Sequence, residues 1–401
     1  MTEIDIPAER PTLRLMPGRA KRLRQGHPWA FSNELAMTPE IKALPPGTLV
    51  TVMDAGGEKL GVATFNPHSL IALRILDRDA GRAIDQSFFA DRLGRAMALR
   101  DLLWDSGHYR LAFSEADGLP GLVVDRYGPV VAVQANSAGM ERLTPLAVAA
   151  LGELLAPRAV VLRNDSPVRG LEGLDSYVRV ALGDLDEPVE IVENGARFLA
   201  DLGEGQKTGW FHDQRDNRAF AASLARGRSV IDFYTHSGGF AIQAALAGAT
   251  MVTAVDRSES SLALAARSAA LNGVEGVCRF VKAEAFGEMA RLAQAGERFG
   301  LVIADPPAFV KSKKDLAAGA RGYRKMTRMA AALVEPGGFL LVASCSHHVT
   351  PEAFGEEVRH GLAAAGRNGR ILRAAGAAPD HPVHPFLPES AYLKVEALQL
   401  D

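Results

Sequence analysis

Cysteine is scarce in this sequence, and signals for secretion or membrane insertion are missing. Only two of the 401 residues are cysteines, Cys278 and Cys345, which is too few for a disulfide framework. The opening stretch, MTEIDIPAER, is acidic rather than basic and does not resemble a secretory leader. The uncharged run at 237–255 approaches membrane-spanning length, but polar residues interrupt it and its pattern changes from helix to strand. We therefore expect a cytoplasmic protein without a membrane span.

The sequence also has little net charge, with a formal value of −2 at pH 7. The 45 lysines and arginines nearly balance the 47 acidic residues, so overall charge does not indicate a polyanionic partner. A nucleic-acid site must then be sought in local clusters. The histidines have no recognised metal-ligand spacing, and we predict no metal site. With 47% hydrophobic residues, the chain is long enough for roughly two or three domains with substantial cores.

The stretch at 230–256, VIDFYTHSGGFAIQAALAGATMVTAVD, has the pattern of a strand, a glycine-containing turn, a helix and a second strand. Nucleotides bind such units at the carboxyl ends of the strands, and the closing acid, here Asp256, takes the ribose hydroxyls. The turn is not GxGxxG, and Asp232 at its start would repel a pyrophosphate. A ligand with adenosine and a positive centre, such as S-adenosylmethionine, fits better. The alternative is an ordinary βαβ unit without a ligand.

The periodicity of the chain predicts three regions. Short strands at 10–82, with a hairpin turn at Gly56-Gly57, indicate a small β-barrel. The region 83–202 combines helices, the first of which Asp85 could cap, with hairpins, one of them at Asn194-Gly195, and we predict a central α+β domain there. Helix and strand patterns alternate over 203–401, which predicts a doubly wound α/β sheet. Its strands are expected at 229–232, 251–255, 277–281, 300–304, 338–344, 370–374 and 391–397.

Two neighbouring strands of that sheet are followed by residues that could take part in catalysis or base binding. Asp305-Pro306-Pro307 follows one strand, and its prolines lack N–H groups, which leaves acceptors suited to the amino edge of a base. Cys345 ends the next strand, where a thiolate could attack an electron-poor ring carbon. The alternatives are a simple strand stop for the prolines and a small buried hydrophobe for the cysteine, which is our interpretation of Cys278.

Two basic clusters are candidates for phosphate binding. The first lies near the amino terminus with Trp29 nearby for base stacking, and the second follows the Asp-Pro-Pro turn. Solvated charged faces are the alternative interpretation of both. The clusters contain Arg10, Arg14, Arg19, Lys21, Arg22 and Arg24, and Lys311, Lys313, Lys314, Arg321, Arg324, Lys325 and Arg328.

An ordered set of motifs runs through the chain. It comprises GHPWAFSNEL at 26–35, EADGLPGLVVDRYG at 115–128, QKTGWFHDQRDNR at 206–218, DFYTHSGGF at 232–240, VDRS at 255–258, DPPAF at 305–309 and SCS at 344–346. With this set, the sequence resembles the large-subunit (23S) ribosomal RNA cytosine-5 methyltransferases that carry an N-terminal PUA-like domain. The resemblance covers nearly the whole chain.

The resemblance implies a PUA-like barrel, a central α+β domain and a Rossmann-like class I methyltransferase domain with a seven-stranded, mostly parallel sheet. It also implies S-adenosylmethionine as cofactor, large-subunit ribosomal RNA as partner, no membrane association and a monomer or homodimer. Cys345 would form a covalent adduct at carbon 6 of a cytosine that is methylated at carbon 5, and Asp305 would contact its ring N3.

The residues expected at the cofactor are Asp232, Tyr234, Gly238, Asp256, Arg257, Glu284, Ala285, Asp305, Gln206, Lys207 and Phe211. Those expected at the RNA are Arg19, Lys21, Arg22, Trp29, Lys311, Lys313, Lys314, Arg321 and Arg324. Glu284 departs from the family pattern, which has an aspartate near the adenine. Two other functions stay open: methylation of another base or a small molecule without a cysteine nucleophile, and RNA binding without catalysis.

Overall fold

The computed structural model describes residues 9–185, 188–203 and 209–401, and the chain divides into two compact units. The first unit comprises Met1–Val189, Asp201–Trp210 and Asp380–Pro388. The second comprises Glu190–Ala200, Phe211–Pro379 and Glu389–Asp401. Within the described ranges, no helix combines the length and the apolar character needed to cross a membrane.

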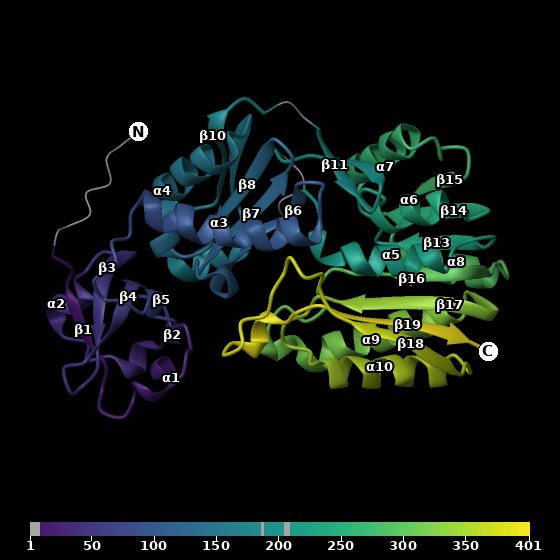
Figure 1. The fold of residues 1–401 in the computed structure, drawn as a ribbon. Coiled ribbons are helices and arrows are strands. Elements are labelled where there is room, and N and C mark those ends of the chain that lie inside the picture. The colour runs from purple at the N-terminus through teal and green to yellow at the C-terminus, as the bar shows by residue number, and fades with distance from the viewer. Residues whose placement is uncertain (1–8, 186–187, 204–208) are drawn as a thin grey trace. The chain divides into compact units, whose positions relative to one another are not determined.

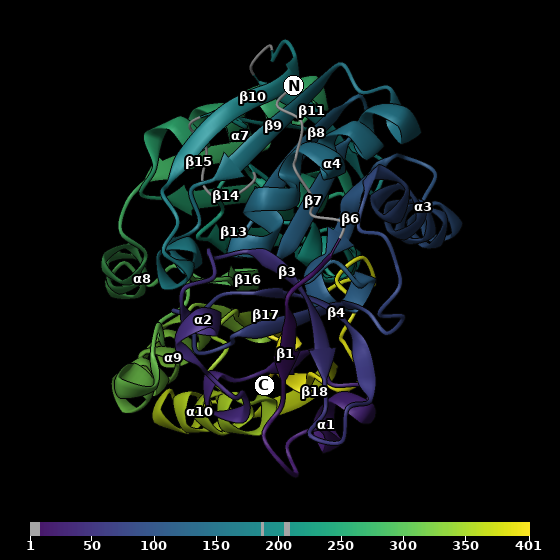
Figure 2. The same cartoon turned by 90° about the vertical axis from the view of Figure 1, so that its left-hand side faces the viewer.

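The first unit begins with a five-stranded sheet that has the order β1-β3-β4-β5-β2 (Figures 1 and 2). The predicted turn at Gly56 and Gly57 is confirmed, because it joins two antiparallel strands. Apolar side chains from these strands form a core of their own. The elements are β1 (Thr12–Arg14), α1 (Lys21–Arg24), β2 (Trp29–Ala30), α2 (Pro39–Lys42), β3 (Thr48–Met53), β4 (Lys59–Phe65) and β5 (Leu73–Asp77).

A second five-stranded sheet follows, with the order β10-β9-β8-β7-β6. Its elements are α3 (Gln86–Leu103), β6 (His108–Phe113), β7 (Leu122–Tyr127), β8 (Val130–Ala135), α4 (Ala138–Leu155), β9 (Ala159–Asn164) and β10 (Tyr177–Gly183). Helices α3 and α4 pack side by side (Figure 2). The predicted cap of α3 is confirmed: the Phe88 backbone N–H donates to Asp85 Oδ1 at 3.0 Å.

The barrel and the central domain share a hydrophobic core. Leu49, Val62 and Leu76 of the barrel strands belong to the same buried cluster as Phe88 and Phe89 of α3. All five side chains are less than a tenth exposed. Burial of this apolar surface therefore stabilises the two domains together.

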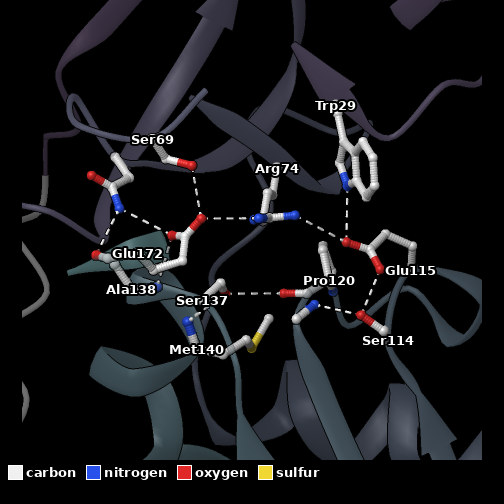
Figure 3. Close-up of polar contacts among 12 residues, drawn as sticks. Trp29, Ser69, Arg74, Ser114, Glu115, Pro120, Ser137, Ala138, Met140 and Glu172 are labelled. Carbon is white, nitrogen blue, oxygen red and sulfur yellow. Dashed lines mark hydrogen bonds and ion pairs between the residues drawn. The ribbon is translucent and has the colours of Figure 1, made fainter. Parts of the chain in front are cut away.

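Polar side chains reinforce this junction (Figure 3). Arg74 of β5 lies between two carboxylates, with Nη1 3.3 Å from Glu115 and Nη2 3.0 Å from Glu172. The Trp29 indole N–H donates to Glu115 at 2.8 Å, and the Ser69 hydroxyl donates to Glu172 at 2.8 Å. The three charged side chains are at most 13% exposed, so each depends on these partners for its charge balance.

The second unit contains the expected seven-stranded sheet, and the order of its strands is β15-β14-β13-β16-β17-β19-β18. All neighbours are parallel except β19, which runs antiparallel to β17 and β18. The strands are β13 (Ser229–Phe233), β14 (Met251–Asp256), β15 (Cys278–Lys282), β16 (Phe299–Ala304), β17 (Val334–Ser344), β18 (Gly369–Ala375) and β19 (Lys394–Leu400).

Helices cover both faces of this sheet, and each face has its own apolar cluster. One cluster includes side chains of α8, α9 and α10, and the other includes side chains of α5 and α6. The helices are α5 (Arg215–Ser223), α6 (Gly239–Leu246), α7 (Glu259–Leu271), α8 (Ala285–Gln294), α9 (Leu316–Ala331) and α10 (Pro351–Ala364). The fold is thus the predicted doubly wound α/β arrangement.

The hairpin of β11 (Val189–Glu193) and β12 (Ala196–Ala200) is also confirmed, with Asn194 at φ +52° and Gly195 at φ +79°. Strand β12 packs against α7, where the Leu199 backbone N–H donates to Ser268 Oγ at 3.0 Å. The domain boundary that we place at residue 202 stays a prediction.

The last strand begins at Lys394, three residues later than the predicted 391–397. Its first residue pairs with Ser344, which is the final residue of β17. The start of β19 is therefore set by the end of its neighbour, and the local apolar pattern does not contain this information.

We expect Arg74→Met to destabilise the first unit, because it leaves the carboxylates of Glu115 and Glu172 without their shared cation. Breaking a buried ion pair costs about 3 kcal/mol, which lowers the unfolding midpoint by roughly 6–12 °C in a unit of this size. Thermal unfolding followed by circular dichroism measures the change. Arg95→Met is the matched control, because Arg95 forms an exposed i,i+4 pair with Asp91. Equal midpoints for the two variants would contradict the expected dependence on Arg74.

Candidate active site

The site lies where the strand order reverses. Strand β13 has β14 on one side and β16 on the other, and the carboxyl ends of these parallel strands meet at one edge. This arrangement brings Asp232, Asp256, Asp305 and Cys345 to the same edge, although they are far apart in the sequence. The sheet order therefore places the ends of these strands, and the expected site residues with them, at one edge of the sheet.

The turn after β13 has an unusual backbone. Tyr234 and His236 have positive φ values of +64° and +52°, and Gly238 has +86°. A Cβ atom at Gly238 would lie 3.1 Å from Ala265 Cβ, so both the conformation and the close packing favour glycine there. Left-handed conformations of residues other than glycine are typical of ligand-binding turns. The His236 backbone N–H donates to Asp256 Oδ2 at 2.9 Å and ties this turn to the next strand.

Asp232 is a carboxyl group buried at the base of this turn, with 1% of the residue exposed. Its Oδ2 accepts the Thr235 hydroxyl at 2.5 Å and the Ala241 backbone N–H at 3.2 Å. Its Oδ1 has no hydrogen-bond partner among the described residues. Burial raises the pKa of Asp232 to about 7, and the charge of Asp305 acts in the same direction. An incompletely satisfied buried carboxylate fits a positively charged ligand group.

Asp256 and Glu284 differ in their contacts: backbone N–H groups orient Asp256 at the end of β14, whereas Glu284 caps a helix. Both Asp256 oxygens are oriented by backbone N–H groups, from His236 and, at 2.8 Å, from Ser258, which fixes the carboxylate at the end of β14. Glu284 is the N-cap of α8, and its oxygens accept the N–H groups of Phe286 at 3.1 Å and Gly287 at 2.8 Å. The longer side chain is thus used to start a helix, and its predicted adenine contact stays a prediction.

The remaining expected cofactor residues are placed as follows. Ala285 is buried at the first position of α8, Arg257 is exposed after β14, and Tyr234 is half-buried with a pKa raised by burial. The Phe211 ring lies 5.1 Å from the His236 ring in an edge-to-face arrangement, beside the turn after β13. Gln206 and Lys207 lie outside the described residues.

Asp305 and Cys345 come from adjacent parallel strands, whose register pairs Ala304 with Val342. The sulfur of the half-buried Cys345 lies 3.9 Å from the carbonyl oxygen of Pro306. The Gln214 side-chain amide donates to Asp305 Oδ2 at 2.9 Å and orients that carboxylate. A candidate nucleophile and a candidate base-binding acid are therefore neighbours.

Cys278 differs from Cys345 in both place and chemistry. It starts β15 at the amino edge of the sheet, and burial raises the pKa of its thiol to about 11. A thiol with such a pKa stays protonated near neutral pH and is a poor nucleophile. This agrees with our interpretation of Cys278 as a structural residue.

The basic cluster after the Asp-Pro-Pro turn is mostly exposed, and it includes Lys311, Lys313, Lys314 and Arg321. Arg324 differs, because its guanidinium forms two hydrogen bonds to Glu357 of α10, at 2.7 and 3.2 Å. The sequence did not reveal this partner, which lies 33 residues away. The charge of Arg324 is thus already balanced within the protein.

The amino-terminal cluster is more strongly engaged within the protein. Arg19 and Lys21 are exposed, whereas Arg22 pairs with Glu34 at 2.9 Å. Trp29 donates its N–H to Glu115, and the Arg74 guanidinium lies 5.5 Å from the centre of its ring. The described contacts of Trp29 connect the barrel to the central domain, and its stacking on RNA stays a prediction.

Sequence reasoning missed three residues that shape the site. Gln214 orients Asp305, Thr235 bonds Asp232, and Lys394 donates hydrogen bonds at 2.6 and 2.7 Å to backbone carbonyls around Cys345. Only Lys394 had a signal in the sequence, namely a lysine within a mainly apolar strand.

Comparisons with known proteins agree with this geometry. Residues 159–372 match the S-adenosylmethionine-dependent methyltransferase family, and residues 13–78 match a PUA-like domain. Ribosomal RNA large subunit methyltransferase I from Erwinia tasmaniensis is 36% identical over 385 residues, covering 95% of this chain and 97% of that protein. Its counterpart from Klebsiella pneumoniae strain 342 is 35% identical over 389 residues, covering 96% and 97%.

Solved structures show the same fold. A putative S-adenosylmethionine-dependent methyltransferase from Streptococcus mutans aligns with a TM-score of 0.81 at 20% identity, over 97% of this chain and all of that one. A putative methyltransferase solved in complex with SAH aligns with a TM-score of 0.82 at 19% identity, with the same coverage.

The chain is an S-adenosylmethionine-dependent methyltransferase with an N-terminal PUA-like domain. Its identity to relatives over almost their full length is specific enough to go further. It belongs to the ribosomal RNA large subunit methyltransferase I family.

We expect the affinity for S-adenosylmethionine to rise between pH 5.5 and 7. A pKa of about 7 means that Asp232 is mostly protonated at the lower pH and half ionised at the upper one. If only the carboxylate binds the cation, affinity increases roughly tenfold over this range. Calorimetric titration of the wild type, Asp232→Asn and the control Glu335→Gln measures this dependence. The Asp232→Asn profile should be flat, whereas Glu335, exposed at the start of β17, should not affect it. A wild-type affinity that is constant over this pH range would argue against the role of Asp232.

Proposed function

We propose that this enzyme methylates carbon 5 of a cytosine in large-subunit ribosomal RNA through a covalent adduct with Cys345. The observation that carries the proposal is the placement of Cys345 beside the Asp305-Pro306 turn, at the sheet edge that also holds Asp232 and Asp256. Relatives that span almost the whole chain are named ribosomal RNA large subunit methyltransferase I, which supports the choice of substrate. This substrate fits a cytosolic location.

The residues at the turn after β13 are suited to hold the cofactor. When bound, S-adenosylmethionine supplies a methyl group on a positively charged sulfur. The buried carboxylate of Asp232 offers an acceptor without a partner among the described residues, which suits the cationic methionine end. Asp256, fixed by two backbone N–H groups, is placed to accept ribose hydroxyls.

Cys345 has the task of activating the cytosine, because carbon 5 of this base is a poor nucleophile. The thiolate adds to carbon 6 and a sulfur–carbon bond forms, which moves the carbon 5–carbon 6 electron pair so that carbon 5 becomes nucleophilic. After methylation, a base accepts the proton of carbon 5. The carbon–sulfur bond then breaks, and its electron pair returns to sulfur.

Asp305 is proposed to bind the Watson–Crick edge of the cytosine. Gln214 holds one of its oxygens, and this fixes the orientation of the carboxyl group relative to the Cys345 sulfur. When its carboxyl group is protonated, Asp305 donates a hydrogen bond to ring N3, which assists addition at carbon 6 because it stabilises the electron density that moves into the ring. The target base must leave its stack to reach both residues, which is cheapest in single-stranded RNA.

The exposed lysines of the segment that follows Asp305 are proposed to bind the RNA backbone. Lys311, Lys313 and Lys314 lie within ten residues of Asp305 along the chain. Phosphate binding by such residues positions the RNA but carries little sequence information. Choice of the target cytosine then depends on RNA shape and on contacts to unpaired bases.

We expect Cys345→Ala to abolish methyl transfer while leaving S-adenosylmethionine binding intact, because only the nucleophile is removed. Transfer of a labelled methyl group to ribosomal RNA, combined with calorimetry, measures both properties. Cys278→Ala is the matched control and should retain activity, since that thiol is half-buried at the opposite edge of the sheet. Full activity of Cys345→Ala would favour a methyltransferase without a cysteine nucleophile. Loss of cofactor binding in the wild type itself would favour a non-catalytic RNA-binding protein.

We expect a triple variant to bind RNA with lower affinity and with a smaller dependence of that affinity on salt concentration. The variant combines Lys311→Ala, Lys313→Ala and Lys314→Ala. Removing three phosphate contacts reduces the slope of log affinity against log salt concentration by roughly 2 for single-stranded RNA. Fluorescence anisotropy at several salt concentrations gives this slope. The matched control neutralises Arg226, Arg298 and Arg370, which are exposed near the amino ends of β13, β16 and β18. Equal slopes for the two triple variants would show that the lysines do not contact phosphates.

A further inference from the structure

Lys394 places a buried ammonium group beside the proposed nucleophile. As the first residue of β19, it pairs with Ser344, the residue before Cys345. Its Nζ donates to the carbonyl oxygen of Ser346, the residue after Cys345, at 2.6 Å, and to the carbonyl oxygen of Tyr392 at 2.7 Å. Only 5% of Lys394 is exposed, and these two backbone carbonyls, one of them from the residue after Cys345, hold its side chain in place.

Among the residues that the structure describes, no carboxylate forms an ion pair with this ammonium. Both oxygens that receive its described hydrogen bonds are neutral backbone carbonyls. Burial lowers the pKa of Lys394 to about 8, and the charge of Cys345 is the one interaction that opposes this effect. Electrostatic attraction is mutual, so whatever Cys345 contributes to the charged form of Lys394, Lys394 returns to the thiolate of Cys345.

Three further titratable groups of the described chain lie close to this segment, and they differ from Lys394 in charge or exposure. The Tyr323 hydroxyl is 2.7 Å from Ser346 Oγ, and burial raises its pKa, so it stays neutral. Asp305 is acidic and disfavours a second negative charge beside it. The exposed His347 ring is stacked on Tyr392 at 5.1 Å between ring centres.

The Tyr392 hydroxyl donates to the Asp213 carboxylate. The carboxylate of Asp305 works against a thiolate at Cys345, and a fixed cation is needed to offset it. Lys394, the first residue of β19, supplies this positive charge.

We propose that Lys394 is the positioning residue that holds Cys345 in the thiolate form, ready for addition to carbon 6. The inference rests on the proposed cysteine adduct and deepens it. Lys394 keeps its proton throughout, and no bond to it forms or breaks. It stabilises the anionic sulfur before addition and again when the carbon–sulfur bond breaks and the electron pair returns to sulfur.

The test compares thiol reactivity with and without the ammonium, in protein that carries Cys278→Ala so that only one thiol is present. Lys394→Met keeps the length of the side chain and removes its charge. The rate of alkylation of Cys345 by iodoacetamide is measured against pH, with mass spectrometry of the labelled peptide. We expect the midpoint of this profile to rise by one pH unit or more, which makes alkylation at pH 7 about tenfold slower. Lys394→Arg should restore part of the difference.

Lys42→Met is the matched control, because Lys42 is exposed on α2 of the barrel and should leave the profile unchanged. Binding of S-adenosylmethionine by calorimetry verifies that each variant is folded. An unchanged midpoint in a Lys394→Met variant that still binds the cofactor would overturn the proposal. A lower kcat with an unchanged KM for RNA would support it.

A second measurement needs no change at Lys394. In protein labelled with carbon-13 at the lysine ε position, the Lys394 signal is titrated by NMR in the wild type and in Cys345→Ala. Loss of the thiolate should lower the titration midpoint of Lys394, and an unchanged midpoint would again overturn the proposal. Both readouts are independent of RNA, so they distinguish failure of this inference from failure of the proposed methylation.

Discussion

The parallel hydrogen bonding of β13, β14, β16 and β17 is the constraint on which the site depends. Register along these ladders fixes which residue stands last in each strand, and a shift of one residue would turn every side chain to the other face. Asp232, Asp256 and Cys345 come close to one another only because these strands end at one edge. The turn with three left-handed residues then presents the backbone N–H of His236, which orients the Asp256 carboxylate.

Charge at this edge is arranged by burial rather than by ion pairing. Burial raises the pKa of Asp232 and lowers the pKa of Lys394. In both residues it disfavours the charged form of the side chain. A ligand or reaction partner of opposite charge stabilises the charged form of such a group. The first fits a cationic cofactor, and the second fits an anionic sulfur, so the two halves of the proposed reaction have separate electrostatic support.

The sequence predicted the sheet and most of its strands because apolar runs and turn residues are local signals. The Asn194-Gly195 hairpin and the Asp85 cap are examples, and both are confirmed by φ values or hydrogen bonds. Contacts between distant segments could not be predicted in this way. Glu357 pairs with Arg324 across two helices, and Lys394 reaches Cys345 only through the antiparallel register of β19. The capping of α8 by Glu284 is a third feature that the sequence did not indicate.

The shared core of the barrel and the central domain has a consequence for how this protein can be rearranged. Phe88 and Phe89 of α3 are buried in a cluster that includes residues of β3, β4 and β5. A chain that lost the barrel would present this aromatic surface to water, and a barrel transplanted elsewhere would carry an uncovered apolar face of its own. The barrel is therefore not an exchangeable module. A truncated protein that keeps this core intact must keep the barrel and the central domain together.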